Sequence, residues 1–90
     1  MPQAIANPED LRRFSAELKQ FNSQLRESTA RLQAQFIHLG DTWRDQEHQK
    51  FAQEFEQTMR VLAHFMRIAD EHVPFLLRKA RRLEEYLQQR

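Results

Sequence analysis

Four histidines and a set of carboxylates are the residues in this chain that could bind a metal ion or transfer protons. Asp45 and His48 stand three residues apart, the spacing that di-iron helical bundles use for one pair of ligands. Such a site needs a second acid–histidine pair and two more carboxylates, yet no Glu-x-x-His sequence occurs. We therefore expect no metal and no cofactor. Structural or surface roles are expected for the four histidines, which are His38, His48, His64 and His72.

Covalent catalysis and phosphate binding also lack their usual residues. The chain has no cysteine, which excludes disulfides, thiol nucleophiles and Cys-ligated zinc. Its single glycine rules out a glycine-rich phosphate loop, and no serine stands near a histidine and an acid on a plausible turn. We do not expect an enzyme.

The sequence RKARR at residues 78–82 is the densest group of cations. Nucleic-acid-binding proteins usually combine such a cluster with stacking aromatic residues and a strongly positive domain. Here the formal net charge is +1, and Glu84 and Glu85 partly balance the cluster. A solvated helix face is the favoured interpretation, and contact with an acidic partner, nucleic acid or anionic lipid is the alternative. We expect no nucleic-acid partner.

The elements that carry these residues are predicted to be two long helices. Asn7 can cap a helix that begins at Pro8, because proline suits the first helical position. Leucines then recur every seven residues from Leu11 to Leu39, a narrow stripe typical of a coiled coil. Phe14 and Phe21 are expected to fill the alternate positions of that stripe. The first helix is predicted over residues 8–39.

Gly40 is expected to end this helix in a left-handed conformation, with Thr42 or Asp41 capping a second helix over about 43–88. Trp43 should close the hairpin by packing over Leu39 and Phe51. Pro74 should kink the second helix, since it lacks the backbone N–H. A turn near 41–42 would place Pro74 level with residue 9. Residues 75–90 would then form a helical overhang, and residues 1–7 a flexible arm, of a single 90-residue domain.

The second helix carries an apolar stripe from Phe51 to Leu87 with a second apolar flank beside it. It is therefore apolar over an arc too wide for one narrow partner helix to cover. A lone hairpin would leave this flank in water, so the predicted fold is an all-α antiparallel hairpin that assembles into a dimeric four-helix bundle. A homodimer is favoured, because the flank belongs to this chain. The predicted dimer interface is Val61, Phe65, Ile68, His72 and Phe75.

The segment GDTWRDQEHQKFAQEF, residues 40–55, resembles the WXG family, the small early-secreted-antigen-like helical hairpins of type VII secretion. Trp43 stands at the family's Trp position near the hairpin turn, and Phe51 matches the aromatic position eight residues later. Asp45 stands where the family has Gly. Several members carry an acid four residues after a C-terminal Tyr as an export signal, whereas Tyr86 is followed at that distance by Arg90.

The resemblance implies a protein that acts by dimerisation and partner recognition, as a secretion substrate, chaperone or targeting subunit. It implies pairing with itself or a sister hairpin and contact with an FtsK-like ATPase, with Trp43 of one subunit near the tail of the other. The tail residues are Leu83, Tyr86 and Leu87. The chain would be cytoplasmic, or exported without a cleavable signal peptide, and has no membrane span. The alternative is a non-secreted structural dimerisation or adaptor module that binds a partner helix.

Overall fold

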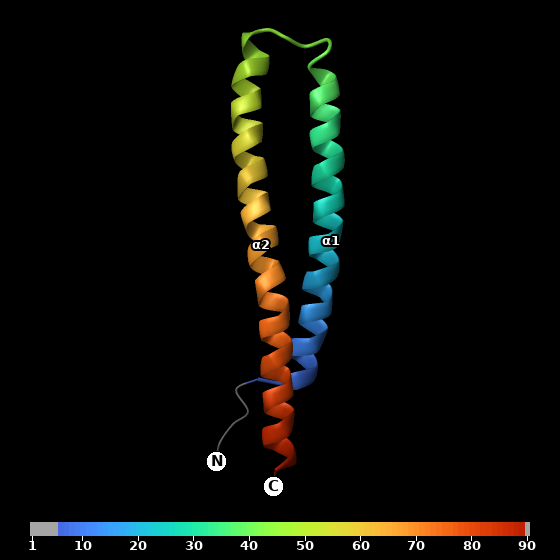
Figure 1. The fold of residues 1–90 in the computed structure, drawn as a ribbon, viewed down its shortest axis with the longest axis vertical. Helices are drawn as coiled ribbons and strands as arrows, with labels where there is room; N and C mark the ends of the chain where they lie inside the picture. Colours follow the sequence, from blue (N-terminus) through green and yellow to red (C-terminus); the bar gives the residue numbers. More distant parts are fainter. Residues whose placement is uncertain (1–5, 90) are drawn as a thin grey trace.

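The chain folds into two antiparallel helices, α1 (Pro8–Leu39) and α2 (Gln46–Gln88), in a computed structural model that describes residues 6–89 (Figure 1). The hairpin is a rod with extents of 68 × 20 × 15 Å. This confirms the all-α hairpin and both predicted ends of the first helix. No helix among the described residues is long and apolar enough to cross a membrane.

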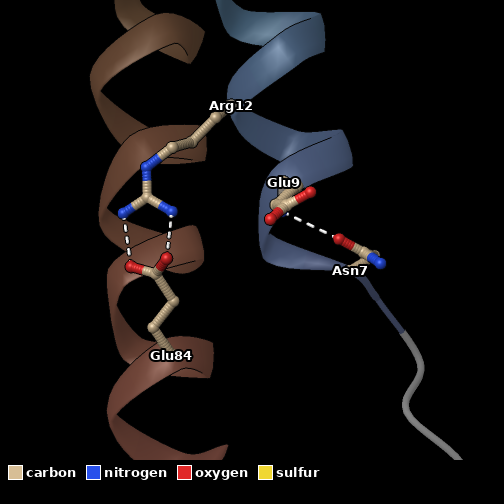
Figure 2. Close-up of polar contacts among 4 residues, drawn as sticks. All are labelled: Asn7, Glu9, Arg12 and Glu84. Atoms are coloured by element: carbon tan, nitrogen blue, oxygen red, sulfur yellow. Dashed lines mark hydrogen bonds and ion pairs between the residues drawn. The ribbon is translucent and has the colours of Figure 1, made fainter.

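The first helix begins as its sequence predicts. The side-chain oxygen of Asn7 accepts hydrogen bonds from the backbone N–H of Glu9 (2.8 Å) and of Asp10 (3.3 Å), and the first of these is drawn in Figure 2. These bonds satisfy amide groups that have no partner within the helix. Pro8 follows the cap, where its missing N–H costs nothing.

The end of α1 differs from the expectation for Gly40, which is right-handed, with φ −62° and ψ −14°. The prediction of a left-handed glycine is therefore wrong. Successive turn bonds satisfy the last helical carbonyls instead: Asp41 N–H donates to His38 (3.0 Å) and Trp43 N–H donates to Leu39 (3.0 Å). A β-carbon at residue 40 would stand only 3.2 Å from the Ile37 carbonyl oxygen, so glycine serves here by its small size.

The second helix begins three residues later than predicted, at Gln46. Its cap is Asp45 rather than Thr42 or Asp41, because the Asp45 carboxylate accepts the backbone N–H of His48 at 3.0 Å. The connection therefore spans residues 40–45. Arg44 strengthens it by donating from Nε to the Gly40 carbonyl at 3.2 Å.

The seam between the helices alternates leucines with small or polar residues on α1, and Phe14 and Phe21 lie beside it, half exposed. The prediction that these phenylalanines fill the seam is wrong. Small side chains let two helices approach closely, which excludes a phenylalanine from those positions. On α2 the predicted stripe is confirmed from Phe55 to Leu83, all of it buried or half-buried. The most deeply buried residues among 6–89 are Ser15, Asn22, Ala69 and Ala80.

Asn22 links the two helices at the middle of the seam, where only 2% of it is exposed. Its Nδ2 donates to the Met66 carbonyl (3.0 Å) and to the Asp70 carboxylate (2.8 Å). Its Oδ1 and the hydroxyl of Ser15 are buried with no hydrogen-bond partner among residues 6–89. A buried amide of this kind favours one alignment of two helices at some cost in stability.

The alignment of the helices also corrects the predicted overhang. Arg12 contacts Glu84, so the start of α1 lies beside residue 84, and Pro74 is not level with residue 9. The longer connection and later start of α2 shift the pairing toward the C-terminus. α2 extends past α1 only over its last residues (Figure 1). The helix continues through Pro74 without a break, and a kink there stays a prediction. The predicted arm falls mostly outside the described residues.

Candidate partner-binding surfaces

An aromatic cluster closes the hairpin at the turn. The rings of Trp43 and Phe51 lie 5.9 Å apart, as expected. Phe36 completes the cluster from α1, with its ring 4.6 Å from that of Phe55 and 5.7 Å from that of Phe51. Aromatic pairs at such separations add about 0.5–1.5 kcal/mol beyond the burial of their area. The cluster gives Trp43 a structural role at the end of the rod.

His48 belongs to this cluster, a role that the sequence analysis missed. Its ring stacks on Phe36 at 5.4 Å and meets the edge of Trp43 at 5.0 Å. The sequence signal for this role is its position seven residues before Phe55, which puts both residues on the side of α2 that contacts Phe36. The other histidines are exposed, as expected: they are His38, His64 and His72. Within residues 6–89, no group of three His, Asp or Glu side chains is placed to hold a metal.

The cluster leaves an open apolar groove near the tip of the hairpin. Leu32, Leu39 and Phe51 line it and are each more than two-fifths exposed. The complete lining is Leu32, Gln35, Phe36, Leu39, Phe51 and Phe55. This end of the rod therefore offers apolar surface to a partner.

Along one long side of the hairpin, ion pairs join α1 to α2. Arg12 donates from both terminal nitrogens to the two oxygens of Glu84 (Figure 2), and Arg26 pairs with Asp70 at 2.9 Å. The hydrogen bond from Arg12 holds the pKa of Glu84 below its usual value, and the same bond raises the pKa of Arg12. Each of the four residues directly follows a seam position. We call this the ion-paired side, comprising Arg12, Lys19, Arg26, Asp70, Leu77 and Glu84.

The opposite side carries aromatic and aliphatic residues. Phe14, Phe21 and Phe65 each directly precede a seam position, and a step of one residue turns about 100° around a helix. Phe21 and Phe65 meet edge to face across the seam, 6.0 Å apart. We call this the aromatic face, comprising Phe14, Phe21, Val61, Phe65, Ile68, His72 and Phe75.

The aromatic face contains all five residues predicted for the dimer interface, and most of it is exposed. Val61 is 67% exposed, Phe65 40% and Phe75 48%, while Ile68 is half-buried and His72 is exposed. The expectation that one hairpin cannot cover this flank is confirmed. Phe14 and Phe21 extend the surface onto α1, which the sequence analysis did not foresee.

The three tail residues do not share one environment. Tyr86 is 68% exposed and Leu87 43% exposed, so both are available to a partner. Leu83 is half-buried on the seam of α2, where it faces α1. Arg12 and Glu84 meet beside it, so this end of α2 is held by α1 rather than free.

A two-helix hairpin with an aromatic tip around a single tryptophan defines a class of small all-helical proteins. The family model WXG100, proteins of 100 residues with WXG, matches residues 3–86 of this chain. The chain belongs to the WXG100 family, which confirms the resemblance carried by Trp43 and Phe51. No curated protein sequence matches the chain.

Solved structures of EsxB, a secreted protein from Bacillus anthracis str. Sterne, have the same fold. A glycine-to-alanine variant is 23% identical, with a TM-score of 0.74 over 93% of this chain and 97% of the other. The selenomethionine-labelled protein is 22% identical, with a TM-score of 0.74 over 96% and 98%. A glutamate-to-glutamine variant is 20% identical, with a TM-score of 0.71 over 100% and 99%.

The departure from the family motif has a structural explanation. Asp45 occupies the position of the family's Gly, has an extended backbone, and caps α2 through its side chain. Glycine and aspartate are both accepted at a helix N-cap, glycine for its backbone and aspartate for its acceptor oxygen. Asp45 therefore caps α2 in this chain although the motif reads Trp-Arg-Asp.

Proposed function

We propose that this protein is a type VII secretion substrate, or the chaperone or targeting subunit of one, that works as a pair of hairpins. The observation that carries the proposal is the aromatic face on a hairpin of the WXG100 family. Burial of exposed Phe and Val side chains is worth about 1.5–3 kcal/mol each when water is fully excluded. Pairing with a second copy or a sister hairpin would cover this surface.

The tip and the tail are the proposed contacts for the secretion machinery. Trp43 and Phe51 present a partly exposed aromatic surface at one end of the rod, and Tyr86 and Leu87 present one at the other. In a pair of opposed hairpins, the tip of one subunit would lie near the tail of the other. An FtsK-like ATPase would read that composite surface, and the chain would leave the cell without a cleavable signal peptide.

A non-secreted adaptor that binds a partner helix is the second candidate. Arg90 favours it, because it stands where several family members have the acid of the export signal. The groove at the tip could also accept an apolar helix, independently of any secretion system.

An export assay tests the proposal. The tagged chain would be expressed in a bacterium with a type VII system, alone and together with its sister hairpin, with or without the secretion ATPase. We expect the chain in the culture medium only when the ATPase is present, while a cytosolic marker stays in the cells. Retention in the cells under every condition would leave the adaptor function.

A further inference from the structure

The arginines of the basic cluster at residues 78–82 have no acceptor within the described hairpin. The other arginines among residues 6–89 each contact an acceptor of the chain, and they are Arg12, Arg13, Arg26, Arg31, Arg44, Arg60 and Arg67. Arg78, Arg81 and Arg82 form no hydrogen bond or ion pair with any residue among 6–89. These three guanidinium groups are therefore unused by the described part of the fold.

The cations of the cluster surround Ala80, which is fully buried in the seam. Two residues turn about 200° around a helix, so Arg78 and Arg82 lie on the outward side of α2, opposite α1. Lys79 and Arg81 stand one residue from Ala80 and lie on either side of it. The three arginines are exposed, and Lys79 is half-buried. We call this the basic face, comprising Arg78, Lys79, Arg81 and Arg82.

Little negative charge of the chain balances the basic face. Residues 76–83 hold four bases and no acid. Glu84 follows them, but both of its oxygens accept from Arg12 of α1 (Figure 2). Of the two acids expected to balance the cluster, only Glu85 is left, and it forms no ion pair among residues 6–89. The structure therefore leaves more positive charge at this end of the rod than the sequence indicates.

The surroundings of the basic face favour a membrane over a nucleic acid. Four cations on one amphipathic helix suit the headgroups of anionic lipids. Tyr86 stands seven residues after Lys79, is 68% exposed, and is of the residue type that is enriched at membrane–water interfaces. A nucleic acid that followed the rod would meet residues 40–58, which hold five acids and two bases. A membrane can instead be contacted by one end of the rod alone.

We propose that the basic face and Tyr86 dock this end of the rod onto the surface of an anionic lipid membrane, without spanning it. The guanidinium and ammonium groups would bind lipid phosphates, and the ring of Tyr86 would lie among the headgroups. This docking goes beyond the proposed function, because the four cations do not belong to the aromatic face and neither pairing nor export requires them. Each cation near such a surface strengthens binding about fivefold.

Co-sedimentation of the full chain with lipid vesicles tests the docking. One set of vesicles would contain equal parts of phosphatidylcholine and phosphatidylglycerol, and the other phosphatidylcholine alone. We expect binding to the anionic vesicles at an ionic strength of about 0.15 M and no binding to the neutral ones. Equal binding to both sets, or binding to the anionic vesicles at low salt only, would overturn the proposal.

Two double variants of equal charge locate the contact on the rod. Arg78→Gln with Arg81→Gln should weaken vesicle binding about 25-fold. The matched control is Arg60→Gln with Arg67→Gln, which removes the same charge from exposed positions of the same helix. Arg67 stands eleven residues before Arg78, about 16 Å and beyond the Debye length of about 8 Å, so we expect a change of less than about twofold. Circular dichroism and light scattering would establish that both variants keep the helices and the mass of the parent.

Labelled oligonucleotides, single-stranded and duplex, provide the competing ligand. At the same salt we expect them to bind at higher phosphate concentrations than the anionic vesicles do. Tighter binding to an oligonucleotide would overturn the membrane and assign the basic face to a nucleic acid. Equal losses in the two double variants would mean that the basic face is not the contact. Binding to no anion would leave it a solvated helix face, while pairing and export would stand or fall by their own tests.

Discussion

The two long sides of the hairpin use the same backbone scaffold in opposite ways. On the ion-paired side, Arg12 and Arg26 of α1 reach Glu84 and Asp70 of α2. On the aromatic face, Phe21 and Phe65 contact each other but remain 52% and 40% exposed. The polar side is completed within one chain, whereas the aromatic face would be covered only by the proposed pairing.

The two sides differ in whether their residues directly follow or directly precede a seam position. The residues that follow Leu11, Leu18 and Leu25 on α1 are cations. The residues that precede the small seam residues Ser15 and Asn22 are phenylalanines. Exposed ion pairs contribute little stability, while exposed aromatic area contributes only when water leaves it. The comparison therefore assigns intrachain alignment to one side and association to the other.

The largest expected effect is that of Phe65→Glu on the aromatic face. A charge at the centre of the proposed interface should raise the dissociation constant of the pair at least about 100-fold, since buried aromatic anchors carry most of such binding energy. Sedimentation equilibrium or light scattering would measure the mass, and melting would fall with dissociation. An unchanged mass and melting temperature would mean that the aromatic face is not an interface.

Leu77→Glu is the matched control on the other side. Leu77 is 40% exposed, the same fraction as Phe65, but it belongs to the ion-paired side. The substitution should leave the mass of the assembly unchanged. If Leu77→Glu dissociates the pair as strongly as Phe65→Glu does, association is not confined to the aromatic face.

The next effect concerns the buried amide between the helices. Asn22→Asp keeps the side-chain shape but removes the Nδ2 donor and brings a second carboxylate to Asp70, whose oxygen now accepts at 2.8 Å. We expect a loss of roughly 2–4 kcal/mol in the free energy of unfolding at pH 7. Urea titration followed by circular dichroism would measure it. The exposed Gln20→Glu, the same amide-to-acid change, should stay within about 0.5 kcal/mol of the parent.

A smaller effect would complete the row of ion pairs. Lys19 and Leu77 each stand midway between the paired residues of their own helix, seven residues from either neighbour. Leu77→Glu should therefore meet Lys19 and add about 0.2–1 kcal/mol, the usual coupling measured for an exposed pair. A double-mutant cycle with Lys19→Ala would isolate this coupling. Zero coupling would mean that the register differs between the two existing pairs.

The smallest effect is that of Glu84→Gln, and its pH dependence carries the information. The hydrogen bond from Arg12 lowers the folded pKa of Glu84, so the pair stabilises the fold above the pKa of an unperturbed glutamate, 4.5. That stability is lost as the pH falls through the lower folded pKa. Wild type should melt slightly above Glu84→Gln at pH 7 and together with it in strong acid. A difference that persists in strong acid would contradict this assignment.

Much of the fold could be predicted from local chemistry. Asn7, Pro8 and the leucine repeat determined the bounds of α1, and the stripe from Phe55 to Leu83 identified the buried side of α2. The seam of α1 could not be predicted, because Ser15 and Asn22 are less apolar than the phenylalanines beside them. Close packing favours small size there, a tertiary requirement that hydrophobicity alone does not reveal.

The candidate surfaces likewise include one feature that could be predicted from local sequence and one that could not. The exposure of Val61, Phe65 and Phe75 could be predicted from the width of the apolar arc on α2, because that width depends on the sequence of this helix alone. The alignment of the tail could not be predicted in this way, since the connection expected over residues 40–42 extends over residues 40–45, with Asp45 as the cap of α2. The longer connection changes which residues of α1 lie beside each residue of the tail.

Because the chain reverses at the tip, the sequence separation between contacting residues of α1 and α2 increases from the tip toward the other end of the rod. Phe36 and His48 meet across a loop of twelve residues, whereas Arg12 and Glu84 are 72 residues apart. Closing the larger loop directly from the unfolded chain costs roughly 1.6 kcal/mol more in chain entropy. We expect the helices to zip together from the aromatic tip, which makes the Arg12–Glu84 end the last to form and the first to fray.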